Sequence, residues 1–266
     1  MLNERYKNDG KPLLKLNAVQ QQKKALVEEH IKEGRYEFEK VRCVICDSDS
    51  FEPLAEKDRY GLYMPTVICR GCGLVQINPR MTQESYNHFY DTCYRSLYTG
   101  SEMAGKSDLF HPKRGLHVCR FLERFMNFEG KKILEVGCGG GWNLNHFHKR
   151  GAVVKGIDLG EEYIEYGKEI YGLDLIQNSV FDLPSDEKDD LIIYSHVMEH
   201  ILDPGQHLQK IRHLLSDGGF IYIEVPGVRN LTFNYQADFL KYLQNAHVYS
   251  LSSVTLKNLM EKYGFE

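Results

Sequence analysis

The stretch Lys131–Trp142, with the sequence KKILEVGCGGGW, constrains this chain more than any other. Its apolar residues up to Val136 predict a buried strand, and four glycines follow within five residues. Glycines allow positive φ angles and leave no Cβ atoms between the backbone and a ligand. A helix that starts at Trp142 would point its free N–H groups at the same ligand. The stretch therefore predicts a ligand-binding junction of strand, loop and helix.

Strands and helices alternate regularly around this junction. Strands are expected near residues 131–136, 153–158, 173–177, 190–194 and 219–225. Helices are expected near residues 116–128, 142–150, 161–171, 204–215 and 251–263. This alternation, with nearly continuous apolar strands, indicates an α/β fold with a doubly wound, mostly parallel, Rossmann-like sheet. Ligands of such sheets bind beyond the carboxyl ends of the strands, where the glycine loop lies.

The residues beside the glycines favour a cationic ligand over a dinucleotide. The dinucleotide fingerprint requires glycine at position 142, which is Trp142 here, and no Gly-Lys-Ser/Thr of a P-loop follows the glycines. Glu135 puts a negative charge where a pyrophosphate would lie, and this charge suits a ligand with a sulfonium and an ammonium group. Asp158, at the end of the second strand, can accept hydrogen bonds from both hydroxyls of a ribose.

Four cysteines form two Cys-x-x-Cys pairs, Cys43 with Cys46 and Cys69 with Cys72, which 22 residues separate. Turn-forming residues follow each pair, as in zinc knuckles. Four thiolates leave no open coordination position, so we predict a structural Zn²⁺ ion. Seven cysteines in 266 residues are too few for a disulfide scaffold, and the N-terminus does not resemble a signal peptide. These features predict a reducing, cytoplasmic location.

A tyrosine-rich segment follows the second cysteine pair. Tyr86, Tyr90, Tyr94 and Tyr98 recur every four residues, so a helix would place them on one face. Two interpretations stay open, an aromatic packing stripe and a lid whose phenol groups point into an active site. Residues 100–115 are polar and turn-rich, which predicts a linker or an extension of this lid.

The length of 266 residues suits one domain of ordinary size and a small module. The net charge of −4 does not attract nucleic acid, and no segment has the roughly 18 to 20 apolar residues that span a bilayer. We therefore expect a small-molecule substrate, with no membrane or nucleic-acid partner.

The predicted divisions are a peripheral helix or arm (1–40, helical at about 19–33), a zinc-binding module (41–80), the tyrosine-rich lid and linker (81–115) and the ligand-binding domain (116–266).

Six segments of the ligand-binding domain together resemble class I S-adenosylmethionine-dependent methyltransferases. They are LEVGCGGG, GIDLG, DLP, DLIIYSHVMEHI, SDGGFIYIEVP and HVYSLSSVTLKNLMEKYGF. The cysteine pairs and the tyrosines are similar to the zinc module and tyrosine-rich segment of methyltransferases that modify nucleotide-linked sugars in antibiotic and surface-polysaccharide pathways, including sugar C-methyltransferases. The resemblance implies S-adenosyl-L-methionine as the methyl donor and a sugar nucleotide as the acceptor.

The resemblance also implies which residues bind the cofactor, at the carboxyl ends of the first four strands. The methionine part would be lined by Glu135, Gly137 and Gly139, and the ribose and adenine would be bound by Asp158 and Leu159. The adenine amino group would be contacted by Ser179 and Val180. The transferable methyl group would lie beside Ser195 and His196. In the family, an acid is more familiar at the place of Ser179 and Val180.

The acceptor of a methyl group must be aligned, and a hydroxyl or carbon acid must lose a proton, whereas a sulfonium leaving group needs no acid. In the resembled family the position of His247, before the last helix, borders the acceptor pocket. We therefore predict His247 as the base, with Tyr90 and Tyr94 orienting the acceptor. A histidine that caps the last helix or packs under it is the alternative for His247.

Other interpretations stay open. An RNA methyltransferase is one, because some ribosomal RNA methyltransferases carry an N-terminal zinc module and residues 1–42 contain ten Lys/Arg against seven Asp/Glu. A non-catalytic scaffold is another.

The segment His196–His200 matches the H-x-x-E-H zinc-peptidase signature, but His196 directly follows a predicted strand, where a helix is not expected to have begun. The family places two more strands after the last helix, so a chain ending at Glu266 is expected to lack them.

Overall fold

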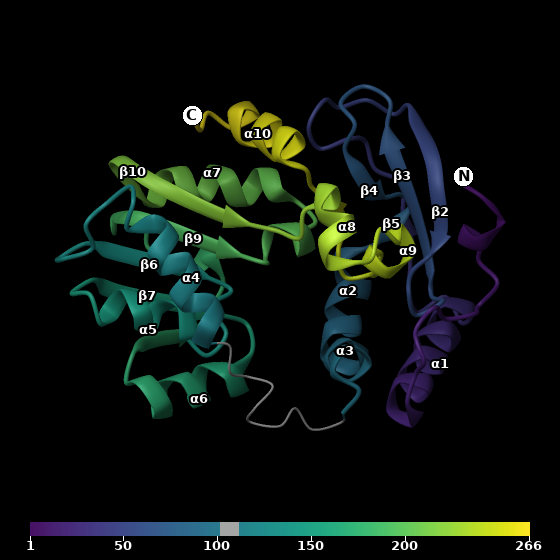
Figure 1. Ribbon diagram of the computed structural model, residues 1–266, viewed down its shortest axis with the longest axis horizontal. Coiled ribbons are helices and arrows are strands. Elements are labelled where there is room, and N and C mark those ends of the chain that lie inside the picture. The colour runs from purple at the N-terminus through teal and green to yellow at the C-terminus, as the bar shows by residue number, and fades with distance from the viewer. Residues whose placement is uncertain (102–111) are drawn as a thin grey trace. The chain divides into compact units, whose positions relative to one another are not determined.

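The computed structural model describes residues 1–101 and 112–266, without the side chains of residues 112 and 113 (Figure 1). Contacts divide the described chain into two compact units. The first comprises residues 1–101, 199–202 and 226–266, and the second comprises residues 112–198 and 203–225. This division differs from the predicted boundaries because the C-terminal segment packs with the N-terminal part. The predicted domain boundaries stay a proposal. None of the helices in the described ranges is long and apolar enough to cross a membrane.

The second unit is built on a five-stranded sheet with the order β10-β9-β6-β7-β8, in which all pairings are parallel. The strands are β6 (Lys132–Val136), β7 (Val153–Asp158), β8 (Asp174–Gln177), β9 (Asp189–Ser195) and β10 (Leu215–Glu224). The central strands are apolar and buried, since Ile133, Leu191 and Ile193 are 0% exposed. The sheet confirms the predicted α/β fold with a doubly wound, parallel, Rossmann-like sheet.

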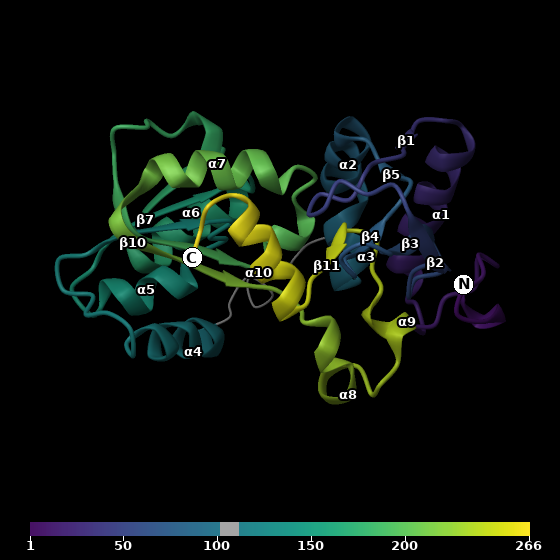
Figure 2. The ribbon, with the colours of Figure 1, turned by 90° about the horizontal axis from the view of Figure 1, so that it is seen from above.

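Helices connect these strands on both faces of the sheet. They are α4 (Pro112–Leu122), α5 (Trp142–His148), α6 (Glu161–Tyr171) and α7 (Pro204–Leu214). The strand order reverses at β6, so right-handed crossovers place α7 on the face opposite α4 and α5 (Figure 2). The reversal sets β6 beside β9, and their carboxyl ends form the switch point at which such sheets bind ligands.

The helix before β6 differs from its predicted range of 116–128. α4 ends at Leu122, because the amide of Phe125 bonds back to the Leu122 carbonyl oxygen at 2.9 Å and closes the last turn. Phe128 then lies outside the helix, is 2% exposed, and packs edge-on against Phe147 with ring centroids 4.9 Å apart. Core packing of this one aromatic residue therefore overrides the helical periodicity of the sequence.

The first unit contains a four-stranded antiparallel sheet, β11-β4-β3-β2, and a two-stranded sheet of β1 and β5. The strands are β1 (Phe38–Glu39), β2 (Phe51–Lys57), β3 (Tyr63–Cys69), β4 (Val75–Ile77), β5 (Arg80–Met81) and β11 (Tyr249–Ser250). Tyr249 pairs with Gln76, and Ser250 pairs with Val75. This pairing explains why the segment after residue 225 belongs to the first unit.

The helices of the first unit agree largely with the sequence. α1 (Ala18–Lys32) confirms the helix predicted at 19–33, and α10 (Ser253–Lys262) confirms that at 251–263. The tyrosine-rich segment is helical, as α2 (Gln83–Phe89), a π-helical turn (Tyr90–Tyr94) and α3 (Arg95–Thr99). Two short helices, α8 (Leu231–Asn234) and α9 (Phe239–Tyr242), precede β11. Of the predicted linker at 100–115, residues 112–115 belong to α4, and residues 102–111 lie outside the described residues.

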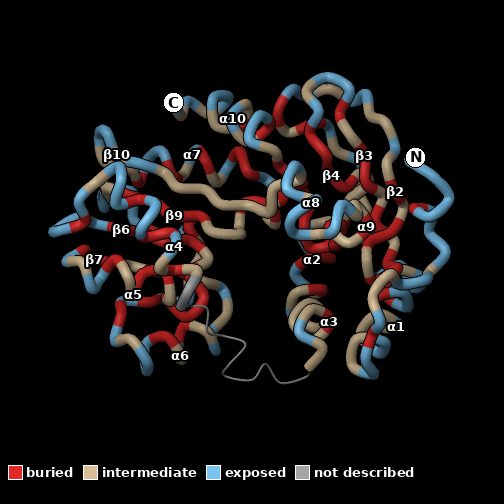
Figure 3. The backbone as a smooth tube through the Cα atoms, in the orientation of Figure 1, coloured by how far each residue is buried: buried red, intermediate tan, exposed pale blue. Residues whose placement is uncertain are grey.

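Each unit has its own apolar core, visible as the buried segments along the strands of both sheets (Figure 3). In the second unit, Phe147 of α5 packs with Ile133 and Ile193 of the sheet. In the first unit, Met64 of β3 packs with Tyr242 of α9. The second core supports the carboxyl ends of the parallel strands, and the first core supports the segment between α9 and β11.

Candidate active site

The glycine loop turns sharply between β6 and α5. Gly137, Gly139 and Gly141 have φ angles of 70°, 52° and 73°, a region that glycine occupies without strain. A Cβ atom at Gly137 would lie 2.4 Å from the side chain of Val197, and one at Gly139 would lie 2.5 Å from that of Trp142. The loop therefore has both the backbone conformation and the close packing that require glycine.

Asp158 connects the loop after β6 with the loop after β7. Its Oδ2 atom accepts a hydrogen bond from the Gly139 amide, and its Oδ1 atom accepts one from the Gly160 amide, both at 2.8 Å. Leu159, the next residue, is 76% exposed. The carboxylate is thus fixed in orientation, and its remaining lone pairs can accept hydrogen bonds from hydroxyl groups.

Glu135 lies near the end of β6 and is 1% exposed. Its Oε1 atom accepts a hydrogen bond of 2.6 Å from Asn143, whereas its Oε2 atom is buried with no hydrogen-bond partner among the described residues. Burial raises the pKa of Glu135 to about 8, and the carboxylates of Asp158 and Glu224 add to this rise, against the opposing effects of Asn143 and Arg114. Oε2 therefore offers an acceptor to a ligand, and a cationic donor would stabilise the ionised form.

Ser179 and Val180 follow β8 and lie near the Asp158 loop. The amide of Asn178 donates to the Asp158 carbonyl oxygen at 3.1 Å. The Ser179 hydroxyl accepts a hydrogen bond of 3.3 Å from the Phe181 amide, which caps a short 3₁₀ turn. Val180 is 2% exposed, so it can offer a ligand little beyond its backbone groups. The predicted adenine residues are therefore close to the predicted ribose residue.

Ser195 and His196 lie where β9 ends beside β10. The Ser195 hydroxyl donates to Glu224 Oε2 at 2.9 Å and accepts a hydrogen bond of 3.0 Å from Arg114. His196 has a φ angle of 57°, and its Nε2 atom lies 3.6 Å from Glu224 Oε1. Four polar side chains therefore meet at this edge, two of which the sequence analysis did not identify.

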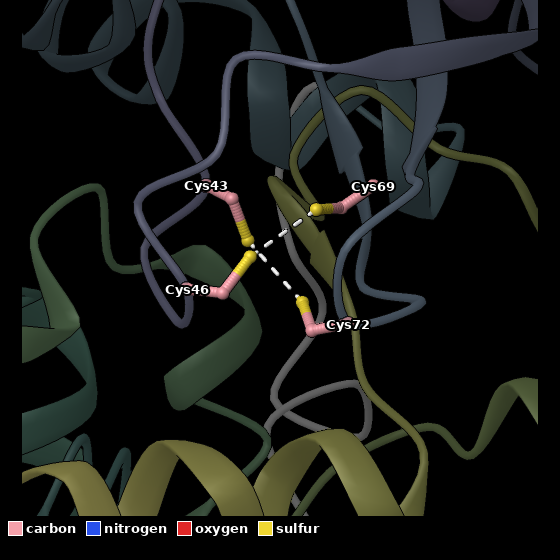
Figure 4. A group of neighbouring side chains, drawn as sticks. All are labelled: Cys43, Cys46, Cys69 and Cys72. Carbon is pink, nitrogen blue, oxygen red and sulfur yellow. Dashed lines mark hydrogen bonds between the residues drawn. The ribbon is translucent and has the colours of Figure 1, made fainter.

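The four cysteines of the predicted zinc site lie together in the first unit (Figure 4). Cys43 Sγ lies 3.4 Å from Cys72 Sγ, Cys46 Sγ lies 3.4 Å from Cys69 Sγ, and all four sulfur atoms lie within 4.8 Å of one another. Sulfur atoms around a tetrahedral zinc ion lie about 3.8 Å apart, given Zn–S bonds of about 2.3 Å. The amide of Gly71 also donates to Cys69 Sγ at 3.3 Å, as in a knuckle. The donor set therefore fits a closed tetrahedral metal site.

The tyrosines of the helical segment pack on one another and reach two histidines of the same unit. The ring centroids of Tyr90 and Tyr94 are 4.7 Å apart, and those of Tyr94 and Tyr98 are 4.5 Å apart. The Tyr90 hydroxyl lies 2.8 Å from His200 Nδ1, and the His200 ring meets that of His247 edge-on at 4.7 Å. The stripe is therefore packed as an aromatic stack and also directs a hydroxyl group to a polar cluster.

His247 is 8% exposed. Its pKa lies well below the usual value, because burial disfavours the imidazolium form and because His200 and Arg59 add positive charge nearby. Burial also lowers the pKa of His200, against the Glu199 carboxylate, whose Oε1 atom lies 3.9 Å from His200 Nε2. Both histidines are consequently neutral at neutral pH and can accept a proton.

The H-x-x-E-H peptidase interpretation is wrong. β9 continues to Ser195, His196 adopts a left-handed conformation, and only Met198–His200 form a 3₁₀ turn. No α-helix presents the two histidines on one face, as that motif requires. His196 packs in the second unit and His200 in the first.

A family model described as a methyltransferase domain matches residues 110–266, more than half of the sequence. The chain belongs to the methyltransferase-domain family. Two curated relatives named ubiquinone biosynthesis O-methyltransferase resemble part of it. The one from Acinetobacter baumannii is 32% identical over 108 residues, which are 38% of this chain and 46% of the relative. The one from Vibrio vulnificus is 28% identical over 129 residues, which are 46% of this chain and 54% of the relative.

The chain thus spans about half the length of the curated relatives it matches. Among solved structures, a SAM-dependent methyltransferase from Archaeoglobus fulgidus is 25% identical, with a TM-score of 0.46 over 57% of this chain and 69% of that chain. The methyltransferase domain includes the whole sheet of the second unit and also residues 226–266, which pack in the first unit. His247 is therefore part of the matched domain in sequence, and its ring packs in the first unit against His200, which the Tyr90 hydroxyl contacts.

Four polar residues of these clusters escaped the sequence analysis. Glu224 ends a strand parallel to β9, so the alternation pattern already placed it at the ligand-binding edge of the methyltransferase domain. Arg114 lay in the predicted linker, because nothing indicated that α4 begins at residue 112. Arg59 and Gln244 are 185 positions apart and hydrogen-bonded at 2.8 Å, a contact for which the sequence gives no local signal.

Proposed function

We propose that the protein transfers a methyl group from S-adenosylmethionine to a small molecule. The observation that carries this proposal is the acidic site at the ends of β6 and β7, where two backbone amides fix Asp158 and Glu135 Oε2 is buried with no partner among the described residues. Glu135 in its ionised form would repel a pyrophosphate and attract a sulfonium and an ammonium group, whereas Asp158 suits the ribose. Membership of the methyltransferase-domain family supports the same cofactor.

The cofactor residues predicted from the sequence keep their roles in this proposal. Glu135 would accept a hydrogen bond from the ammonium group through its unpartnered Oε2 atom, and the backbone of Gly137 and Gly139 would line the methionine part. Asp158 would accept hydrogen bonds from the ribose hydroxyls, and the exposed side chain of Leu159 would cover one face of the adenine. Bound S-adenosylmethionine supplies an electrophilic methyl group on a sulfonium that leaves as a neutral thioether.

The remaining cofactor residues lie after β8 and β9. The Ser179 hydroxyl, which caps a 3₁₀ turn, and the backbone of Val180 would contact the adenine amino group. Ser195 and His196 would lie beside the transferable methyl group, and a hydrogen bond to Glu224 holds the serine in place. These residues contact the cofactor and shield the reacting centre from water.

For the acceptor we propose a nucleotide-linked or surface-polysaccharide sugar, with His247 as the base. His247 takes the proton from the acceptor hydroxyl or carbon acid while the acceptor atom bonds to the methyl carbon. The lowered pKa of His247 suits this role, because the neutral imidazole is the proton-accepting form. Tyr90 and Tyr94 orient the acceptor through their hydroxyl groups.

The function is tested by incubating the full chain with S-adenosylmethionine labelled in the methyl group and a panel of nucleotide sugars. We expect label on at least one sugar. An intermediate of ubiquinone biosynthesis is the second candidate acceptor, because two relatives carry that name. Label on RNA, with binding that weakens as salt rises, would support the RNA methyltransferase instead. No label on any acceptor would leave the scaffold interpretation.

We also propose that Cys43, Cys46, Cys69 and Cys72 bind one structural zinc ion. Four thiolates close the coordination sphere, so the ion has no position for a substrate. The ion would brace the short strands β3 and β4, which follow one another through the second cysteine pair. The location that we propose is the reducing cytoplasm, where thiolates of Cys-x-x-Cys pairs bind metal.

Replacement of Cys46 by Ser should remove the bound zinc and lower the melting temperature by roughly 10 °C, since a loss of several kcal/mol shifts the midpoint of a chain this long by about 2–4 °C per kcal/mol. Metal content measured by mass spectrometry and a thermal melt test this. Cys93→Ser is the control, because Cys93 is a thiol of the first unit that lies outside the cluster; Cys93 is buried whereas Cys46 is exposed, so the control is the more demanding change for the fold. Wild-type protein without stoichiometric metal would contradict the proposal.

The affinity for S-adenosylmethionine should depend on pH through Glu135. Its pKa of about 8 in the free protein means that the carboxyl is mostly protonated at pH 6, and binding of an ammonium group requires the ionised form. The affinity of the wild type should therefore rise between pH 6 and 7.5, by at most about tenfold per pH unit. Glu135→Gln should bind more weakly, without this rise. Calorimetry at several pH values measures both, and parallel pH profiles of the two proteins would refute the assignment.

A further inference from the structure

The segment between α9 and β11 carries His247, and a turn after β2 holds this segment in place. Asp58 is 0% exposed, and its Oδ1 atom accepts the amides of Tyr60 and Leu62 at 2.8 and 3.0 Å. Its Oδ2 atom accepts the amide of Asn245 at 3.3 Å. This carboxylate therefore closes its own turn and also fixes the backbone two residues before His247.

Arg59, the next residue of the turn, reaches Gln244. Its own amide donates to the Leu243 carbonyl oxygen at 3.1 Å, and its guanidinium donates to Gln244 Oε1 at 2.8 Å. The guanidinium also stacks with the rings of Tyr60 and Tyr98, at 5.1 and 5.5 Å from their centroids. Arg59 thus has a fixed position, and its strongest side-chain contact is the amide oxygen of Gln244.

The orientation of the Gln244 amide follows from this contact. A guanidinium only donates hydrogen bonds, so the oxygen of the amide must face Arg59 and the NH₂ group must face the other way. The NH₂ nitrogen lies 2.9 Å from Nδ1 and 2.8 Å from Nε2 of His247. The His247 amide in turn donates to the Gln244 carbonyl oxygen at 3.0 Å, which closes a tight turn. A donor group therefore faces the imidazole of His247.

A donor beside an imidazole opposes its protonation, because the imidazolium has only donors to offer. The charges of His200 and Arg59 act in the same direction and add to the effect of burial, which lowers the pKa of His247. Around His247, the titratable and charged groups are His200 and Glu199 from the turn at residues 198–200, Tyr90 and Tyr98 from the helical segment, and Asp58 and Arg59 from the turn after β2.

We propose that Arg59, acting through Gln244, is a positioning residue that holds His247 in its neutral, proton-accepting form. This proposal rests on the proposed function, in which His247 removes the proton of the acceptor. Arg59 itself touches no reacting atom. Its role is to fix the orientation of the Gln244 amide, which in turn disfavours the imidazolium form of His247.

Nuclear magnetic resonance of the full chain, with histidines labelled at Cε1, tests the proposal without any acceptor. The His247 signal is identified by its loss in His247→Asn. In the wild type its titration midpoint should lie below the usual value of 6.5. In Arg59→Met the midpoint should rise, because the charge is lost and the amide is free to turn over. In Arg59→Lys, which keeps a charge and a donor, it should stay near the wild-type midpoint.

If Arg59→Met does not fold, Gln244→Met tests the same step, and its midpoint should also rise because the donor is removed. An unchanged midpoint in a folded Arg59→Met or Gln244→Met variant overturns the proposal. Once an acceptor is known, the acid limb of the kcat profile should move to higher pH together with the midpoint. A shifted midpoint without methyl transfer would contradict the proposed function alone, whereas transfer with an unshifted midpoint would contradict the positioning role alone.

Discussion

Replacement of Asp158 by Ala should abolish measurable binding of S-adenosylmethionine. The carboxylate orders two loops, through hydrogen bonds of 2.8 Å from the amides of Gly139 and Gly160, and it offers its other lone pairs to the ribose. Two charge-assisted hydrogen bonds to the ribose, at about 1.5–3 kcal/mol each, correspond to a loss of roughly 10² to 10⁴ in affinity. Isothermal calorimetry of the purified chain measures this loss directly.

Two variants separate recognition of the ribose from a general effect on folding. Asp158→Asn keeps the size of the side chain and one acceptor, so it should bind with an intermediate affinity. Asp186→Ala removes an exposed aspartate of the same unit and should bind as the wild type does. Thermal melts show whether the Asp158 variants fold. Normal affinity in a folded Asp158→Ala protein means that the ligand assignment is wrong.

Replacement of His247 by Phe should leave binding of S-adenosylmethionine intact and reduce turnover by roughly 10² to 10⁴, the usual contribution of a general base. The phenyl ring preserves packing in a site that is 8% exposed, so the loss reports chemistry more than folding. In the wild type, the pKa of His247 lies well below its usual value, mainly because of burial. Turnover should therefore be constant around neutral pH and fall only in acid, where the base becomes protonated.

The control for His247 is His213→Phe, which changes an exposed histidine of the other unit and should not alter turnover. Single-turnover experiments with labelled cofactor separate the chemical step from product release. Turnover of His247→Phe within a factor of two of the wild type would show that another group, or water, removes the proton.

Hydrophobic patterning made the fold of the second unit readable from the sequence. Buried parallel strands are continuous apolar runs, so β6 and β7 were located within one residue of their observed ends. The glycine loop and Asp158 were recognisable because a ligand-binding strand end needs particular residue types at fixed spacing. The cysteine pairs were recognisable for the same reason, and their sulfur atoms do lie together.

Contacts between distant parts of the chain were beyond the sequence. The two-residue strand β11 is too short for a periodic signal, and its pairing with β4 depends on packing. The link from Arg59 through Gln244 to His247 depends on side-chain directions that only the folded chain defines. Short-range patterns therefore located the glycine loop and its strands, and they gave no signal for the contacts of His247 within the first unit.

The central claim is that the glycine loop and its two carboxylates bind a sulfonium cofactor and not a dinucleotide. Calorimetric titration of the wild-type chain with S-adenosylmethionine, its product S-adenosylhomocysteine and NAD tests it most directly. The account predicts one binding site per chain for each of the first two ligands and no binding of NAD. Binding of NAD, or no heat with either adenosyl ligand, would contradict it.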